Sequence, residues 1–184
     1  GSEDTVVDIG GNIGVFAVLA GKMAKRVISV EPSSRNCDLM LENIRLNGLE
    51  NIEVIQAAVM DKSGKGLLSL SGHGYHSTVF KMTAQSEEVS FLTLDQLFEE
   101  HEIEQCDFLK LDCEGAEFPI IRKQDPSLWN RVGKIAMEWH SESESEAQDR
   151  YDEMLALLKS AGFHIDHSNS EVGFKSGHVF ARRP

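Results

Sequence analysis

Val6-Val7-Asp8-Ile9-Gly10-Gly11-Asn12-Ile13-Gly14 is the stretch that decides the fold of this chain. It opens with a short, largely β-branched run, which predicts a buried strand, and the glycines after it predict a tight turn into a helix. Glycine adopts positive φ without a steric penalty and lets the backbone pass close to a ligand. A strand, a glycine-rich turn and a helix N-terminus in this order predict a site for a nucleotide-like ligand at the carboxyl end of the strand.

The rest of the chain alternates between apolar runs and helical patterns. Further strands are expected at residues 27–30, 52–55, 108–112 and 135–139, and helices at residues 14–23, 33–47, 94–100 and 147–161. In the less clear middle part, a short strand is expected at residues 67–70 and extended chain at residues 89–93. This order predicts an α/β fold: a doubly wound, Rossmann-like sheet, mostly parallel, with helices on both faces. Two closing apolar runs, residues 163–167 and 179–182, predict an antiparallel C-terminal edge hairpin. We therefore expect a single domain over residues 1–184 with one central sheet.

Composition and charge narrow the range of partners. The 184 residues carry a net charge of −12, which argues against a nucleic-acid partner and against docking on an anionic membrane. No apolar run approaches the ~20 residues that a membrane-spanning helix needs, so we expect no membrane insertion. Cys37, Cys106 and Cys113 share no metal-like spacing, which predicts reduced thiols in a cytoplasmic protein.

The glycine pattern indicates which ligand the turn holds. A dinucleotide fingerprint needs glycine where this chain has Asn12 and Val15, so an NAD-linked oxidoreductase is the disfavoured alternative. Asp8 suits S-adenosylmethionine (SAM), because the methionine end of SAM carries an ammonium group and SAM has no phosphate. Asparagine is the non-glycine residue that best tolerates the left-handed conformation expected at Asn12. Glu31 lies 21 residues after Gly10, at the end of the second strand, where an acid accepts hydrogen bonds from both ribose hydroxyls.

Polar clusters follow the fourth and fifth strands. Asp112, Glu114 and Glu117 come directly after an apolar strand, and His140 ends the next strand. Because the carboxyl ends of neighbouring parallel strands meet at one edge, Asp112 and His140 are expected to face the same crevice as the glycine turn. Histidine is a suitable general base near neutral pH. The alternatives are structural roles: a helix N-terminus stabilised by Glu114 and Glu117, and a structural histidine at position 140.

Taken together, these motifs resemble the FkbM family of SAM-dependent methyltransferases. The resemblance covers Val6 to about His140 and is most specific in Lys110-Leu111-Asp112-Cys113-Glu114-Gly115-Ala116-Glu117, accompanied by Val30-Glu31-Pro32, Thr93-Leu94-Asp95 and Met137-Glu138-Trp139-His140. It implies O-methylation of hydroxyl groups on sugars, polyketides and related small or lipid-linked molecules. Related enzymes have an N-terminal segment over the cofactor. The few residues before Val6 are consistent with a catalytic core that lacks this cap, or with a minimal member of the family that has an open site.

The resemblance also implies roles for individual residues. The SAM site comprises Asp8, Gly10, Asn12, Gly14, Glu31 and Pro32, with Ala57 and Ala58 beside the adenine. The methyl-transfer site is lined by Asp112, Glu114 and His140. Asp112 or His140 is expected to act as the base, and Glu114 to position the substrate.

The expected partner is a small-molecule or glycan-type acceptor, without nucleic acid. No metal is expected, because no ligand spacing compels one, but acids gathered around one crevice leave a divalent cation as the alternative. His73-Gly74-Tyr75-His76 is interpreted as an edge of the substrate pocket rather than a metal-binding pair. A SAM-binding or interaction domain without catalysis is the remaining alternative function.

Overall fold

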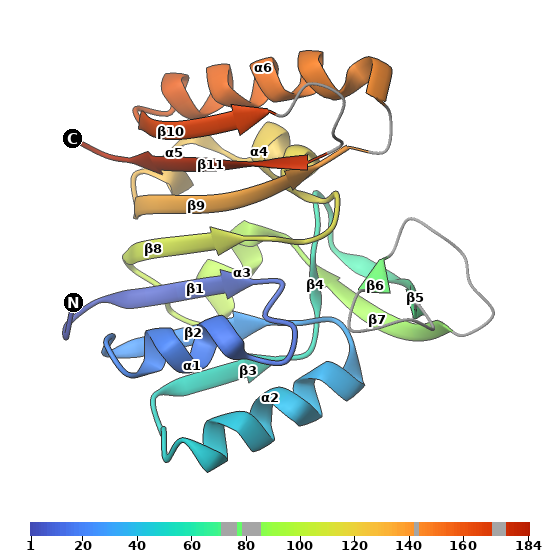
Figure 1. The fold of residues 1–184 in the computed structure, drawn as a ribbon, viewed down its shortest axis with the longest axis vertical. Helices are drawn as coiled ribbons and strands as arrows, with labels where there is room; N and C mark the ends of the chain where they lie inside the picture. Colours follow the sequence, from blue (N-terminus) through green and yellow to red (C-terminus); the bar gives the residue numbers. More distant parts are fainter. Residues whose placement is uncertain (71–76, 79–85, 142–143, 171–175) are drawn as a thin grey trace.

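The computed structural model describes residues 1–70, 77–78, 86–141, 144–170 and 176–184 (Figure 1). Its helices are α1 (Val15–Gly21), α2 (Ser34–Leu46), α3 (Leu94–Glu100), α4 (Glu117–Lys123), α5 (Pro126–Trp129) and α6 (Glu144–Ser160). Its strands are β1 (Thr5–Ile9), β2 (Arg26–Val30), β3 (Ile52–Ile55), β4 (Ala58–Val59), β5 (Gly64–Leu70), β6 (Ser77–Thr78), β7 (Ser86–Leu92), β8 (Cys106–Leu111), β9 (Val132–His140), β10 (His164–Ser170) and β11 (Ser176–Arg182).

A seven-stranded sheet forms the centre of the fold, in the order β10-β11-β9-β8-β1-β2-β3. From β9 to β3 all neighbours pair in parallel, as the alternation of strands and helices predicts. β11 is antiparallel to both β9 and β10, which confirms the predicted C-terminal hairpin. The antiparallel strand lies one position inside the edge, because α6 first carries the chain to the edge position of β10 and the short connection then brings β11 back beside β9.

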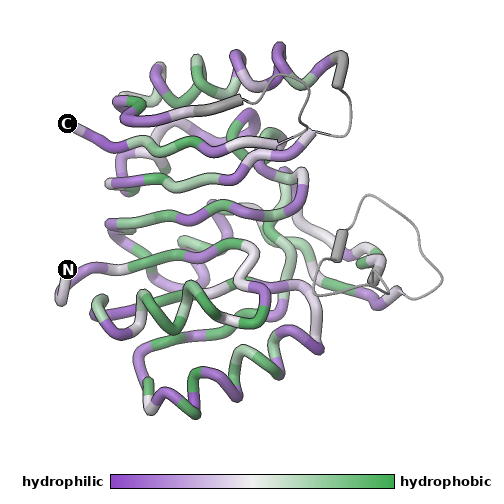
Figure 2. Tube along the Cα trace, in the orientation of Figure 1, coloured by the Kyte–Doolittle hydropathy of each residue, from purple (hydrophilic) through white to green (hydrophobic). Residues whose placement is uncertain are grey.

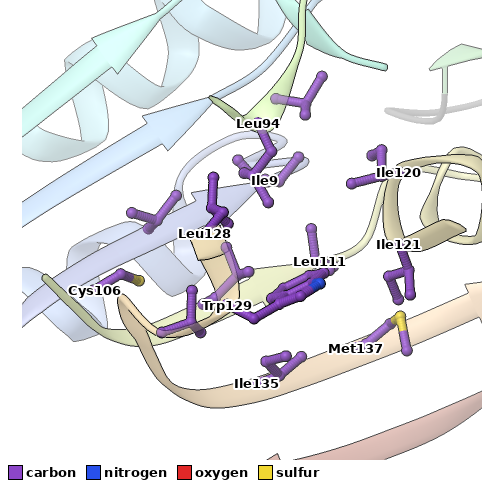
Figure 3. Close-up of a cluster of buried hydrophobic side chains, with 14 of the residues drawn as sticks. Ile9, Leu94, Cys106, Leu111, Ile120, Ile121, Leu128, Trp129, Ile135 and Met137 are labelled. Atoms are coloured by element: carbon purple, nitrogen blue, oxygen red, sulfur yellow. The ribbon is translucent and has the colours of Figure 1, made fainter. Parts of the chain in front are cut away.

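Helices cover both faces of this sheet, because side chains alternate between the faces along each strand. In β1, Val6 packs in a core cluster with α1 and α2, whereas Val7 packs in a larger cluster with α3 to α6. Figure 3 shows part of the larger cluster, where Leu111 of β8 and Met137 of β9 lie near side chains of α4 and α5. Figure 2 shows hydrophobic residues concentrated in the central strands, while α2 and α6 alternate hydrophobic and hydrophilic residues. The predicted doubly wound α/β fold is confirmed.

A second sheet of four strands, in the order β4-β7-β5-β6, interrupts this pattern between β3 and α3. The central sheet is as expected, but the expectation that it is the one sheet of the chain is wrong. The short strand expected at residues 67–70 and the extended chain expected at residues 89–93 lie in β5 and β7, but their pairing into a sheet of their own was not expected. Figure 1 shows the small sheet beyond the carboxyl ends of β1, β2 and β8. Glu87 of β7 ties it to the main fold, because its carboxylate accepts hydrogen bonds from the amide (2.9 Å) and the hydroxyl (2.7 Å) of Ser34 at the start of α2.

Two further features concern the described residues as a whole. Cys37, Cys106 and Cys113 are free thiols. No helix in the described ranges is long and apolar enough to cross a membrane.

Candidate active site

The turn between β1 and α1 has the left-handed backbone conformation at the positions where the sequence predicts it. Gly10 has a φ of 82°, Gly14 of 85°, and Asn12, which takes the place of a glycine, of 50°. A Cβ atom on Gly10 would lie 1.7 Å from the backbone oxygen of Asp112, so no side chain fits there. On the other side, the Gly10 amide donates a hydrogen bond of 2.9 Å to the Val30 carbonyl. The turn is therefore held in direct contact with the ends of β2 and β8.

A cavity of about 150 Å³ lies where β1, β2, β8 and β9 end. Nine predicted site residues line it: Gly10, Asn12, Glu31, Pro32, Ala57, Ala58, Asp112, Glu114 and His140. Met60, Leu68 and Glu138, to which the sequence analysis assigns no role, also line the cavity. Asp8 and Gly14 are described by the structure but are not among the lining residues.

Glu31, at the end of β2, has a carboxylate that is already bonded to the protein. Its Oε1 accepts hydrogen bonds from the Ser33 amide (3.0 Å) and Asn36 Nδ2 (3.1 Å), and its Oε2 accepts one from the Asn12 amide (2.9 Å). A carboxylate offers about four acceptor positions, so Oε2 is the oxygen with room for a further donor. Burial raises the pKa of Glu31, and these hydrogen bonds oppose that rise. The predicted contact with the ribose is therefore expected at Oε2.

A buried polar row crosses three neighbouring strands beside the cavity. Asp8 of β1 pairs in register with Ser29 of β2 and with Lys110 of β8, so the three side chains emerge on one face of the sheet. The Ser29 hydroxyl donates to Asp8 Oδ2 at 2.9 Å, and Lys110 Nζ lies 3.4 Å from Asp8 Oδ1. Burial raises the pKa of Asp8, and the charge of Lys110 opposes that rise. Direct contact between Asp8 and the cofactor ammonium stays a prediction.

Asp112, Glu114 and His140 converge on one wall of the cavity. Each offers a possible ligand atom, and these atoms lie within 4.8 Å of one another. Asp112 directly follows β8 and His140 ends β9, so the parallel pairing of these two strands brings them together. Glu114 Oε2 is 3.9 Å from His140 Nε2. Their chemical roles stay predictions.

Glu117 fixes the geometry of this cluster. Its fully buried carboxylate accepts hydrogen bonds from the amides of Cys113 (2.6 Å) and Gly115 (3.0 Å), which holds the loop after β8. It also accepts a hydrogen bond of 3.3 Å from His140 Nδ1. The other ring nitrogen, Nε2, is therefore the one near Glu114.

Carboxylates surrounding His140 set its charge. Burial alone would lower the pKa of His140, but the hydrogen bond to Glu117 and the charges of Glu114 and Glu138 outweigh burial and raise this pKa to about 9. At neutral pH the imidazole is then protonated and cannot accept a further proton. Of the two predicted bases, the positive charge on His140 therefore favours Asp112 as the proton acceptor.

Lys110, Glu117 and Glu138 belong to the site, although the sequence analysis assigns no catalytic or binding role to them. Lys110 stands one residue before the end of β8, as Asp8 does in β1, so the strand positions alone could have paired them. Glu138 precedes His140 by two residues in β9 and therefore shares its face of the sheet. The predicted pocket edge His73-Gly74-Tyr75-His76 lies outside the described residues.

The comparison with family models decides the identity of the chain. The model described as the methyltransferase FkbM domain matches residues 8–165. The chain belongs to the FkbM methyltransferase family. Methyltransferase sdnD of Sordaria araneosa is 23% identical over 92% of this FkbM methyltransferase and 77% of its own length. Another curated relative is 41% identical over 54 residues, and the match spans only 21% of that relative.

Solved structures of methyltransferases share the fold of this FkbM methyltransferase. An rRNA methylase from Streptococcus thermophilus superposes with a TM-score of 0.62 at 12% identity, covering 99% of this chain and 87% of its own. TrmK of M. capricolum, in complex with the natural cofactor product S-adenosylhomocysteine (SAH), superposes with a TM-score of 0.56 at 11% identity, covering 98% of this chain and 62% of its own.

SAM is the cofactor of this FkbM methyltransferase, and the NAD-linked alternative is wrong. The residues of the cavity fit SAM on two counts. Gly10 lines the cavity and carries no side chain, so a ligand can approach its backbone closely. Glu31 keeps acceptor capacity on Oε2 for a ribose hydroxyl.

One expectation about partners is wrong. The sequence predicts a small-molecule or glycan-type acceptor and no nucleic acid. Similar proteins include rRNA and tRNA methyltransferases and ribosomal protein L11 methyltransferases. The net charge of −12 does not support the exclusion, because it sums charges over the whole chain and does not describe the local surface around the cavity.

Proposed function

We propose that this FkbM methyltransferase is an O-methyltransferase whose acceptor hydroxyl binds at Asp112, Glu114 and His140. The observation that carries the proposal is the convergence of these three side chains on the wall of the cavity that Gly10 and Glu31 also line. SAM supplies an activated methyl group, so that a carbon–sulfur bond breaks as a carbon–oxygen bond forms.

A hydroxyl group is a poor nucleophile, and the protein improves it by holding it in line and removing its proton. Asp112 is the proposed proton acceptor, since His140 is already protonated at neutral pH. Glu114 and the imidazolium of His140 are proposed to orient the hydroxyl, one as acceptor and the other as donor of a hydrogen bond.

RNA and protein are the acceptor classes to test first, because similar proteins are described as acting on them. Both contain hydroxyl groups, and the 2′-hydroxyl of RNA is both a hydrogen-bond donor and an acceptor. An acidic wall favours contact with a neutral hydroxyl over contact with a phosphate, so the hydroxyl rather than the backbone charge is proposed to enter the cavity.

The test identifies the atom that becomes methylated. Purified protein is incubated with methyl-labelled SAM and separate RNA and protein fractions of a cell extract, and labelled products are digested and analysed by mass spectrometry. We expect the label on oxygen, and a loss of labelling in Asp112→Asn. The exposed Asp149→Asn variant makes the same chemical change away from the cavity and is expected to label normally. A label on ring nitrogen or carbon would refute O-methylation, and SAH binding without any turnover would favour the non-catalytic alternative.

A further inference from the structure

We propose that Asp112, Glu114 and His140 form a binding site for a divalent first-row transition metal ion, such as Mn²⁺, that holds the acceptor hydroxyl. This inference rests on the proposed O-methylation and replaces the expectation of a metal-free site. In it the ion takes the place of the proton on His140 Nε2, so that the ion rather than the imidazolium and Glu114 holds the hydroxyl. The three side chains come from the ends of two neighbouring strands and the loop after β8, and their ligand atoms lie within 4.8 Å of one another.

The cavity gives such an ion room for ligands from outside the protein. All three residues are partly exposed and line the cavity of about 150 Å³. With three protein ligands, an octahedral ion keeps positions for a substrate oxygen and water. With bonds of ~2.1 Å, the ligand atoms of an octahedral ion are ~3.0 Å apart at adjacent positions and ~4.2 Å apart at opposite ones. Binding therefore needs ligand atoms that are up to 4.8 Å apart to draw together by up to about 2 Å.

The orientation of His140 suits metal coordination. A metal-binding histidine usually donates its other ring N–H to a carboxylate, which fixes the tautomer and the ring. Here Nδ1 of His140 donates to the buried Glu117, and the Nε2 atom near Glu114 is the one available to an ion. Glu117 is itself fixed by amides of the loop that carries Glu114, so the histidine and the loop are ordered by one carboxylate.

The local charge also favours a cation. In the part of the chain that the structure describes, Asp8, Asp112, Glu114, Glu117 and Glu138 gather around Lys110 and His140. The carboxylates outnumber the cationic side chains whether or not the imidazole is charged. The carboxylates that stabilise a proton on His140 would stabilise a divalent ion at Nε2 in its place.

The ligand set indicates the kind of ion. Two carboxylates and one imidazole, with open positions, suit first-row ions such as Mn²⁺ or Fe²⁺ better than Mg²⁺ or Ca²⁺, which prefer oxygen ligands alone. An ion at this position lowers the pKa of a bound hydroxyl. The proton of that hydroxyl passes to the uncoordinated oxygen of Asp112, the methyl carbon moves from sulfur to oxygen, and the products are a methyl ether, neutral SAH and protonated Asp112, which returns its proton to water.

The test measures Mn²⁺ binding to the EDTA-treated, dialysed full chain by the loss of the electron paramagnetic resonance signal of free Mn²⁺. We expect one site per chain, and affinity at least about tenfold lower in Glu114→Gln, His140→Gln and Glu117→Gln. Glu99→Gln and His164→Gln make matched changes at exposed positions outside the site and are expected to bind Mn²⁺ normally. SAH affinity, measured in parallel by calorimetry, shows that each variant is folded.

Two outcomes separate this inference from the proposed function. If the cavity variants bind Mn²⁺ as tightly as the unmodified chain, or if EDTA leaves O-methylation unchanged, the metal site is refuted and the O-methyltransferase stands. If the metal binds with the expected losses but the label appears on nitrogen or carbon, the metal site stands and the hydroxyl acceptor is refuted.

Discussion

Asp8 and Lys110 lie opposite each other on neighbouring parallel strands, and the ammonium of Lys110 is shared between the buried Asp8 (3.4 Å) and Asp112 on the cavity wall (3.2 Å). Asp8 is fully buried, so its charge depends on this one cation and on the Ser29 hydroxyl. The pair therefore connects the stability of the sheet to the electrostatics of the site.

Lys110→Met should destabilise the fold by about 3 kcal/mol, because it leaves a buried carboxylate without a counter-ion. Burial already raises the pKa of Asp8, so protonation offsets the loss and the deficit should shrink as the pH falls. Urea unfolding at several pH values measures both effects. Lys65→Met removes an exposed ion pair and should cost about 0–1 kcal/mol. Equal decreases in the free energy of unfolding of Lys110→Met and Lys65→Met would show that the pairing of Lys110 with Asp8 contributes little.

Gly10→Ala should reduce both stability and SAH affinity, because its Cβ would lie 1.7 Å from the Asp112 carbonyl oxygen. Gly48→Ala is the matched control: Gly48 has a φ of 64° with nothing within 4 Å, so it carries the left-handed penalty of about 1 kcal/mol without the clash. Thermal unfolding and calorimetry compare the two. A Gly10→Ala variant no less stable than Gly48→Ala would mean that β8 moves away freely.

Glu31→Ala should weaken SAH binding by about 1.5–3 kcal/mol, since a charge-assisted hydrogen bond to the ribose is lost. The same change removes the acceptor of three protein hydrogen bonds, so stability should fall as well. Circular dichroism identifies conditions in which the variant is fully folded, and calorimetry under those conditions measures SAH affinity separately from stability. Glu50→Ala, at an exposed position, is the control. An unchanged dissociation constant for SAH would remove Glu31 from the cofactor site.

Asp112→Asn should lower kcat by ~10²–10⁴-fold, the usual contribution of a positioned proton acceptor. SAH affinity should change much less, because the Gly10 turn contacts the Asp112 backbone rather than its side chain. Steady-state turnover and calorimetry measure the two quantities. Wild-type turnover in this variant would rule out a chemical role for the carboxylate.

The cysteines should react slowly with iodoacetamide at pH 8 in the folded chain. Burial raises the pKa of Cys37 and of Cys106 to about 12, and burial raises that of Cys113 well above its usual value, so thiolate is scarce at this pH. In denaturant all three thiols should react, because they are free. Mass spectrometry counts the modified residues. Fast labelling of Cys113 without denaturant would indicate that the loop after β8 opens readily.

The sequence predicted the main sheet well because its strands are buried on both faces and read as continuous apolar runs. Val27 to Val30, for example, contributes to the core on both sides. The small sheet was predicted only in part. A short strand at residues 67–70 and extended chain at residues 89–93 were expected and lie in β5 and β7, but their pairing into a separate sheet was not expected. β4 and β6 have two residues each, so no periodic pattern distinguishes them from loops.

The sequence predicted which residues lie at the site, but not which contacts they make. Asp112 and His140 follow from the rule that parallel strands end at one edge, and the structure brings them together. The charge of His140 could not be read from the sequence, because it depends on Glu117 reaching back from α4 and on Glu138 beside it. Likewise, the sequence could not show that Asp8 does not line the cavity, because this depends on how β1 is buried between its neighbouring strands.

The contact between Gly10 and the Asp112 carbonyl has a consequence for how reactants are aligned. No atom fits between the turn that is expected to hold the cofactor and the strand end that is expected to hold the acceptor, so the two cannot shift relative to each other while β1 and β8 stay paired. The two binding sites are thus aligned once, when the sheet folds, so that each turnover needs only the binding of the two reactants and no rearrangement of the sites.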